Sequence, residues 1–471
     1  MPGLSAGPTR SACSPCDDVA GHPKILSLSL TCRWGPSQHR RKLGRSRPFP
    51  RSRAHVNATP SSHGQKAALG KRQPVRSLAR KALLRLLRVL ERAAPEHDDV
   101  TYLDFVPHPT SRGETADISA RANWYLPQSA RAIPIYCGKG SDDPYPADAA
   151  YMDPELVSPP GWSRHRPEGR RHVVLHRFTP RSTFEYLRAL GNATVVSEGF
   201  AYGSDEAYFD LHRRFCRTRP PTPGESVARL LGLQEKGGTA LVLATGPSAS
   251  LLDERSIAAS GVRITCNSAV RDSSLMEALQ PDLIAFSDPV FHYGPSRYAA
   301  SFRKDLLQAL DETGALLLTS QLFVEPLLAH EPRLADRLVV LPLTSGGAWR
   351  WPTPDEPTVR ITGNVLTNLM LPAAFSLADR VLIAGCDGRE VSERYYWRHN
   401  PATQYSDGLM RTAFEAHTAF FRDRDYADYY ERHCKQLEEF FVTAERAGKQ
   451  VTGVTPSHIP ALLDRGAPAF A

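Results

Sequence analysis

From position 226 onward, short apolar segments alternate with segments of helical character, and this alternation constrains the fold more than any other feature. We expect seven strands, at 240–244, 262–265, 283–286, 315–318, 338–341, 381–384 and 450–454. Each is a nearly continuous apolar run, as is typical of parallel strands that are covered by helices on both faces. The alternation therefore predicts a mostly parallel α/β sheet over 226–460, wound in the Rossmann-like manner.

The chain before this region predicts a smaller α/β unit over 98–220. Pro and Gly are dense between its elements, and no chemical motif stands out there. A linker follows at 219–224, and a short tail occupies 461–471. The expected strands are 100–106, 132–137, 172–177 and 193–197, and the expected helices are 182–190 and 205–216.

Charge divides the chain into a basic leader and a slightly acidic body. Residues 1–100 hold 19 Lys and Arg against 6 Asp and Glu, and the remainder holds 39 against 44. Residues 1–74 are rich in Pro, Ser, Arg and Gly without a period, so we expect them to be disordered. Because the body is not basic, the composition disfavours a nucleic-acid-binding protein.

Residues 75–97 form a separate segment, in which 75–93 predicts a basic amphipathic helix. Leucines repeat there at helical spacing beside a row of Lys and Arg. This helix would either cover the fold with its apolar face or lie on an anionic membrane surface. No apolar run reaches 18 residues, and the start lacks a secretory signal pattern. We expect a cytoplasmic protein, with peripheral contact at the inner membrane surface as an alternative.

The eight cysteines do not predict a disulfide framework in a chain without a secretory signal. Cys13 and Cys16 form a Cys-x-x-Cys pair, but no second pair follows at metal-binding spacing. We therefore predict no metal site from them.

Polar residues follow several of the expected strands, at the edge where such sheets bind ligands. Gly246, Pro247 and Ser248 follow the first strand and form a turn that could hold phosphate or simply cap a helix. Asn267 follows the second strand, where it would bind a base or ribose or close an Asx turn. Asp288 follows the third strand, as a polar contact or a turn residue.

Two further motifs stand later in the chain. Arg360, Thr362 and Gly363 precede a long apolar helix at 366–377, and such a helix start predicts an anion site. Asp387 stands in a Gly-Cys-Asp-Gly segment after the strand 381–384, and Arg389 follows it closely.

In this order the motifs resemble the small bacterial sialyltransferases that use CMP-sialic acid. The frame is also similar to 6-hydroxymethylpterin pyrophosphokinase-like proteins. The resemblance covers about 238–460, roughly half of the chain. It implies that the turn at Gly246 to Ser248, Asn267 and the segment at Arg360 to Gly363 hold the nucleotide-sugar, together with Asp387.

The same resemblance implies the catalytic residues. Tyr395 matches a Tyr that contacts the donor phosphate, and Arg389 stands where the family has a second Tyr. His433 falls near the place of the family's catalytic His, before an expected helix at 435–447, with His399 and His417 as rival bases. A solvated helix histidine is the alternative for His433, and Tyr426, Tyr429 and Tyr430 would form a packing stripe. Thr245 and the Gly-Asn after Thr362 depart from the family's pattern, which puts sialic acid itself in doubt.

The resulting hypothesis is a glycosyltransferase of surface glycan or polysaccharide synthesis, with a nucleotide-sugar donor and a glycan acceptor. A His would take the proton from the hydroxyl of the glycan acceptor, while Tyr and Arg would stabilise the leaving phosphate. On this hypothesis no cofactor or metal is required. One alternative is a pyrophosphokinase-like enzyme that uses ATP and Mg²⁺, in which further carboxylates would converge with Asp288 and Asp387 on one metal ion. Another is a non-catalytic scaffold that retains the fold.

Overall fold

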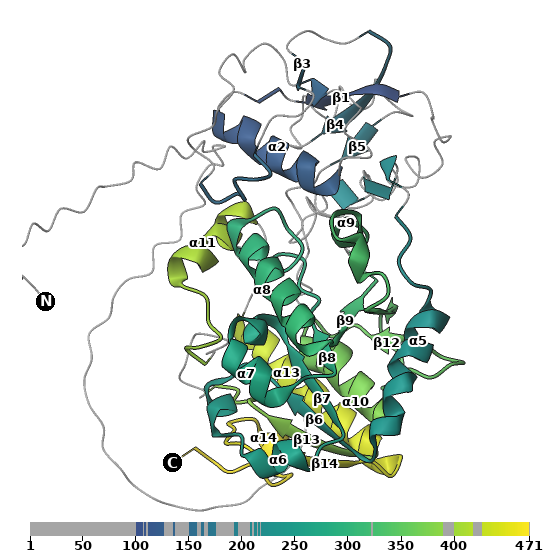
Figure 1. Ribbon diagram of the computed structural model, residues 1–471, viewed down its shortest axis with the longest axis vertical. Coiled ribbons are helices and arrows are strands. Elements are labelled where there is room, and N and C mark those ends of the chain that lie inside the picture. Colours follow the sequence, from purple (N-terminus) through teal and green to yellow (C-terminus); the bar gives the residue numbers. More distant parts are fainter. Residues whose placement is uncertain are drawn as a thin grey trace, which may run out of the picture. The chain divides into compact units, whose positions relative to one another are not determined.

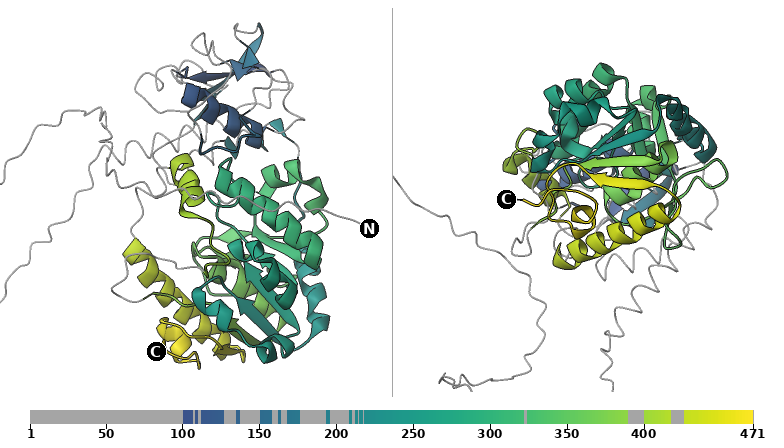
Figure 2. Two further views of the ribbon diagram at one scale, coloured as in Figure 1. Left: turned by 60° about the vertical axis from the view of Figure 1, so that its left-hand side comes forward. Right: turned by 90° about the horizontal axis from the view of Figure 1, so that it is seen from below.

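The computed structural model is shown in Figures 1 and 2. The residues that it describes are 100–106, 108–109, 112–126, 135–136, 150–157, 162–163, 168–175, 193–195, 208–209, 212–213, 215–216, 218–321, 324–389, 400–417 and 426–470. The expected leader at 1–74, the helix at 75–93, the helix at 182–190 and Tyr395 lie outside these residues.

A seven-stranded parallel sheet organises the C-terminal half of the chain. Its order is β10-β9-β8-β7-β6-β13-β14, and every pair of neighbours is parallel. The strands are β6 (Thr239–Leu243), β7 (Val262–Cys266), β8 (Leu283–Ala285), β9 (Leu316–Ser320), β10 (Leu338–Leu341), β13 (Arg380–Ala384) and β14 (Gln450–Gly453). All seven predicted strands therefore exist, with their ends shifted by at most two residues.

The strand order reverses direction beside β6. The chain moves outward from β6 through β7, β8, β9 and β10, and then returns to place β13 on the other side of β6. This reversal leaves the carboxyl ends of β6 and β13 adjacent, because the two strands pair in parallel as neighbours in the sheet. In open α/β sheets ligands bind at such a reversal, outside the carboxyl ends of the strands.

Helices cover both faces of this sheet, as the view from below in Figure 2 shows. One hydrophobic cluster joins the sheet to α5 (Pro223–Leu231), the π-helix η6 (Leu366–Met370), α10 (Leu371–Leu377), α13 (Tyr426–Arg446) and α14 (Pro460–Leu463). The other face packs against α7 (Ser273–Leu279), α8 (Arg297–Thr313) and α9 (Val324–His330). Burial on both faces explains why these strands are almost entirely apolar.

The helix ends follow local sequence signals. Thr222 and Glu225 form a reciprocal capping box at the start of α5, with Pro223 at its first position. Asp272 accepts a hydrogen bond from Leu275 N at the start of α7, and Gly314 ends α8 in the left-handed conformation. These are the residue types that each position favours.

Shorter elements connect the main ones. They are the 3-10 helices η2 (Gly232–Lys236), η3 (Pro247–Leu251), η4 (Asn267–Arg271) and η5 (Pro332–Leu334), the helices α6 (Glu254–Ala258) and α11 (Asp407–Ala416), and the two-stranded pair β11 (Leu343–Thr344) and β12 (Val359–Arg360).

A second parallel sheet precedes the large one in sequence. Its order is β3-β2-β1-β4-β5, formed by β1 (Val100–Val106), β2 (Ile135–Tyr136), β3 (Trp162–Ser163), β4 (Arg170–Leu175) and β5 (Ala193–Val195). The helix α2 (Arg112–Tyr125) follows β1, although its sequence gave no expectation of a helix. The division of the chain into domains at 98–220 and 226–460 stays a prediction.

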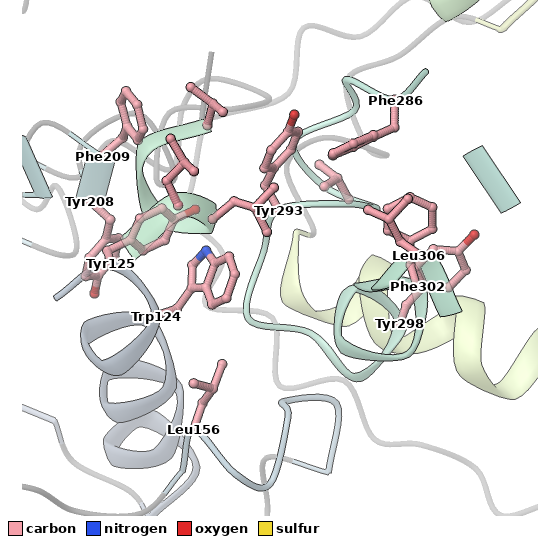
Figure 3. Packing of buried hydrophobic residues seen from close by; sticks show 14 of the residues in the cluster. Trp124, Tyr125, Leu156, Tyr208, Phe209, Phe286, Tyr293, Tyr298, Phe302 and Leu306 are labelled. Atoms are coloured by element: carbon pink, nitrogen blue, oxygen red, sulfur yellow. The ribbon is translucent and has the colours of Figure 1, made fainter. Parts of the chain in front are cut away.

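Aromatic side chains fill a large hydrophobic cluster that includes the end of α2. Trp124 stacks on His330, with ring centroids 4.4 Å apart and an interplanar angle of 5°. The buried guanidinium of Arg303 lies 3.9 Å from the centre of the Trp124 ring. Figure 3 shows this cluster, in which Trp124, Tyr125, Leu156, Tyr208, Phe209, Phe286, Tyr293, Tyr298, Phe302 and Leu306 are labelled.

One predicted helix boundary is wrong. The helix expected at 435–447 is the C-terminal part of α13, which begins at Tyr426 and runs for 21 residues. Tyr430 and His433 are buried, so the buried face of α13 extends before the predicted start at 435. No helix in the described part of the chain is long and apolar enough to cross a membrane.

Candidate functional site

The candidate site lies where the chain leaves β6, β13 and β14. The turn after β6 carries Gly246 and Ser248, the loop after β13 carries Asp387, and the loop after β14 carries Thr455. Backbone amides donate the hydrogen bonds that join these segments: Gly246 N donates to Gly385 O at 2.9 Å, and Gly385 N donates to the side-chain hydroxyl of Thr455, also at 2.9 Å. Residues from three separate parts of the sequence are thus fixed at the reversal of strand order.

The carboxylate of Asp387 is the centre of this arrangement. It accepts a hydrogen bond from Ser248 N at 2.8 Å and a second one from Ser248 Oγ. Ser248 Oγ also lies 3.0 Å from Thr455 Oγ1. Burial raises the pKa of Asp387, while the hydrogen bonds from Ser248 and the nearby charge of His458 act in the opposite direction. Asp387 therefore holds the Gly-Pro-Ser turn.

Gly246 is required because no side chain fits at that position. A Cβ built on it would lie 2.5 Å from Asp387 Oδ1 and 2.5 Å from Gly385 O. Its φ of −65° is ordinary, so the constraint is close approach rather than backbone conformation. The sequence predicted a turn at Gly246, and the structure shows that the loop carrying Gly385 and Asp387 packs closely against it.

Asn267 differs from its neighbours in conformation and in hydrogen bonding. Its φ is 50°, in the left-handed region that non-glycine residues rarely adopt. Its Oδ1 is buried, and no described group donates a hydrogen bond to it. A strained backbone with an unsatisfied polar atom at a strand end is typical of a ligand-contacting residue.

Thr362 and Gly363 begin a polar cluster at the start of η6. Asn368 Oδ1 accepts hydrogen bonds from Thr362 N at 2.6 Å and from Thr362 Oγ1 at 2.7 Å. Gly363 has a φ of 81°, and Asn364 Oδ1 accepts a hydrogen bond from Leu366 N at 2.9 Å. The segment then continues as a π-helix, a form found frequently at functional sites.

Arg360 has partners within the protein. Its guanidinium carbon lies 4.4 Å from the centre of the Trp349 ring, and Nη1 lies 4.0 Å from Glu439 Oε2 on α13. Trp349 Nε1 donates to the same carboxylate oxygen at 3.3 Å. The side chain of Arg360 is 26% exposed, so part of it still faces solvent.

Two neighbouring tyrosines of α13 connect the helix to both candidate loops. Tyr429 Oη donates a hydrogen bond to Gly363 O. Tyr430 Oη accepts from Arg389 N at 3.1 Å, and the Arg389 guanidinium lies 4.9 Å from the centre of the Tyr430 ring. These two side chains therefore position the segments at Gly363 and Arg389, which is more specific than the packing stripe that the sequence predicted.

His433 lies on the same side of α13, since it stands three and four residues after these tyrosines. The sequence placed it before a helix, but it is inside one, and it is 3% exposed rather than solvated. Burial lowers the pKa of His433 to about 4, so the imidazole is neutral at physiological pH.

Other predicted residues have separate positions. Asp288 Oδ1 accepts hydrogen bonds from Val290 N and Phe291 N, so Asp288 acts as a turn residue, which was one of its two predicted roles. His417 packs at the end of α11, where a Cβ added to Gly294 would lie 2.8 Å from its Nε2. Tyr395 and His399 lie outside the described residues. Among the residues that the structure describes, no group of three or more His, Cys, Asp or Glu side chains could hold a metal ion.

Sequence reasoning missed several residues at the site. No role was predicted for Thr455 or Ser457, yet Ser457 Oγ donates to Cys386 O at 2.7 Å. His458 N donates to Asp387 O at 2.6 Å. Their position directly after the last predicted strand was a usable signal, because every parallel strand ends at the same edge.

Neither models of known protein families nor curated proteins match this chain. The resemblance to sialyltransferases therefore rests on the motifs alone.

Proposed function

We propose that this protein is a glycosyltransferase with a Rossmann-like catalytic sheet, which takes a sugar from a nucleotide-sugar donor and transfers it to a glycan acceptor. The observation that carries the proposal is the meeting of Gly246, Ser248 and Asp387 at the reversal of strand order beside β6. Such reversals are the usual place for nucleotide ligands in sheets of this kind.

The residues around this point offer the contacts that a nucleotide-sugar needs. Asn267 presents an amide oxygen that no described group satisfies, which suits a hydrogen-bond donor of a base or ribose. Arg360, at the end of β12, and Arg389, in the loop after β13, are partly exposed cations. Cations placed near the leaving phosphate would stabilise the charge that develops there.

His433 is the proposed proton acceptor. A neutral imidazole can take the proton of the acceptor hydroxyl, and burial keeps His433 neutral. Tyr429 and Tyr430, on the same side of α13 as His433, form hydrogen bonds with Gly363 and Arg389. In this proposal α13 aligns the base with the donor, and Tyr395 contacts the donor phosphate.

Thermal-shift measurements on the full chain test the proposal. CMP, UDP, GDP and ATP are each added with and without Mg²⁺, and the bound nucleotide raises the midpoint by mass action. We expect stabilisation by CMP, UDP or GDP without Mg²⁺. Stabilisation by ATP with Mg²⁺ alone would favour the pyrophosphokinase-like alternative instead. A chain that binds none of the four nucleotides would favour the scaffold alternative.

Two variants test the assigned roles. Arg360→Ala should weaken binding of the stabilising nucleotide, with Arg333→Ala as a matched control at an exposed ion pair elsewhere on the surface. His433→Ala should abolish transfer while nucleotide binding persists. Full transfer activity in His433→Ala would assign the base to another residue.

A further inference from the structure

His458 occupies a position at the candidate site that the sequence motifs did not assign. It follows β14, which is the neighbour of β13. The segments after these two strands leave the sheet side by side, because Val454 N donates to Ile383 O at 2.9 Å. Asp387 and His458 then meet through the hydrogen bond from His458 N to Asp387 O at 2.6 Å. His458 is thus attached to the loop that holds the Gly-Pro-Ser turn.

The backbone around His458 is tightly fixed. Ser457 is buried, and its Oγ donates to Cys386 O at 2.7 Å and accepts from Ile459 N at 3.0 Å. Ser457 N donates to Pro468 O at 3.0 Å, which holds the C-terminal segment against this loop. The imidazole therefore projects from a rigid support, as a ligand-binding group requires.

The ring itself is oriented by one contact and remains available for others. It stacks on Phe470, with centroids 4.4 Å apart and an interplanar angle of 22°. Neither ring nitrogen has a hydrogen-bond partner among the described residues, and the side chain is partly exposed. An imidazole held in this way can donate a hydrogen bond to a ligand oxygen.

We propose that His458 binds the phosphate group of the nucleotide at the ends of β6, β13 and β14. The charge of His458 acts to lower the pKa of Asp387, and both carboxylate oxygens of Asp387 already accept hydrogen bonds from Ser248. The imidazole, and not the carboxylate, is therefore the group left to meet an anion. This inference rests on the proposed function, because it takes a nucleotide as the ligand.

The test compares each nucleotide with its own nucleoside on the full chain. Binding of CMP and cytidine, and likewise of UDP and uridine, is measured by calorimetry for the wild type and for His458→Asn. A lost hydrogen bond to a charged group corresponds to roughly a 10-fold to 100-fold loss of affinity. We expect this loss for the nucleotide, with affinity for the nucleoside unchanged.

Phe470→Leu is the matched variant, because it removes the stacking partner but keeps the imidazole. The Phe470→Leu variant should lose less nucleotide affinity than His458→Asn. Its melting midpoint should be similar to that of His458→Asn. Equal losses for nucleotide and nucleoside in His458→Asn would show a structural role and overturn the phosphate contact. Unchanged nucleotide affinity would overturn it too, while leaving the proposed function intact. If the wild type binds no nucleotide, both proposals fall.

Discussion

The carboxylate of Asp387 accepts hydrogen bonds from both the backbone amide and the hydroxyl of Ser248, which stands 139 residues earlier in the chain. This pair joins the turn after β6 to the loop after β13 at the reversal of strand order. It thereby fixes the centre of the candidate site without any ligand.

Replacing Asp387 should destabilise the protein more than replacing Ser248. Asp387→Ala leaves the buried amide of Ser248 without an acceptor, and we expect a loss of about 2–3 kcal/mol in the free energy of unfolding. Ser248→Ala removes only the hydroxyl and should cost about 1 kcal/mol. Urea unfolding of both single variants and the double variant measures their coupling. Strictly additive losses would show that the two residues do not act as a unit.

Gly246→Ala should disrupt the turn by direct overlap with backbone. The added Cβ would meet Gly385 O and Asp387 Oδ1 at 2.5 Å, and we expect a destabilisation of at least about 2 kcal/mol. Gly238→Ala is the matched control, because nothing lies within 4 Å of the Cβ there. Thermal unfolding compares the two variants, and equal melting midpoints would contradict the steric argument.

Tyr430→Phe isolates the hydroxyl that holds the Arg389 loop. The aromatic ring and its contact with the Arg389 guanidinium remain, but the hydrogen bond from Arg389 N is lost. We expect a loss of about 1 kcal/mol in stability, together with weaker binding of the stabilising nucleotide. Calorimetric titration checks the second effect. If the Tyr430→Phe variant binds the nucleotide as tightly as the wild type, the Tyr430 hydroxyl does not position the Arg389 loop for binding.

Stability should fall as the pH decreases from about 6.5 to about 4, because His433 is buried. Its pKa is lowered to about 4 in the folded state, so the unfolded state binds the proton first and is favoured across this window. The contribution amounts to about 3 kcal/mol for a shift of this size. His292, whose pKa burial lowers to about 3, adds to the same trend.

His433→Gln should reduce this acid sensitivity. Urea unfolding at pH 7 and pH 4.5 gives the two free energies for the wild type and the variant, and the difference should be smaller in the variant. The measurement at pH 7 also shows whether the variant folds. An unchanged difference would mean that His433 is not buried as a neutral group.

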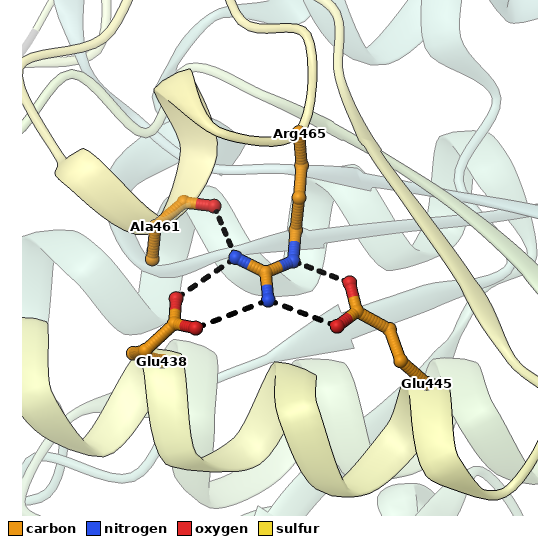
Figure 4. A network of polar contacts seen from close by, with 4 residues as sticks. All are labelled: Glu438, Glu445, Ala461 and Arg465. Carbon is orange, nitrogen blue, oxygen red and sulfur yellow. Dashed lines mark hydrogen bonds and ion pairs between the residues drawn. The ribbon is translucent and has the colours of Figure 1, made fainter.

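Arg465 should stabilise the contact between α13 and α14 through its fork of hydrogen bonds. It donates to Glu438, Glu445 and the carbonyl of Ala461, as Figure 4 shows. Arg465→Lys keeps the charge but loses the fork, and we expect a cost of about 1–2 kcal/mol. Arg333→Lys, at an exposed ion pair, should cost less than about 0.5 kcal/mol in the same unfolding assay. Similar losses would show that the Arg465 network adds nothing beyond charge.

The sequence determined the seven strands and their parallel character, because burial on both faces requires continuous apolar runs. It also located the residues after β6, β7 and β13, since a strand end is visible where an apolar run stops. It could not locate the start of α13, because tyrosines and charged residues at 426–434 do not show which face is buried. The helix α2 was missed for a similar reason, as its sequence has almost no apolar periodicity.

Only the tertiary structure decided which of these residues act together. The order of the strands brings Asp387 to Ser248, and the packing of α13 brings Tyr429 to Gly363 and Tyr430 to Arg389. Contacts of this kind join segments that are far apart in sequence, and no local spacing encodes them. The sequence thus determined the elements and the edge at which the site lies, whereas long-range packing decided its partners.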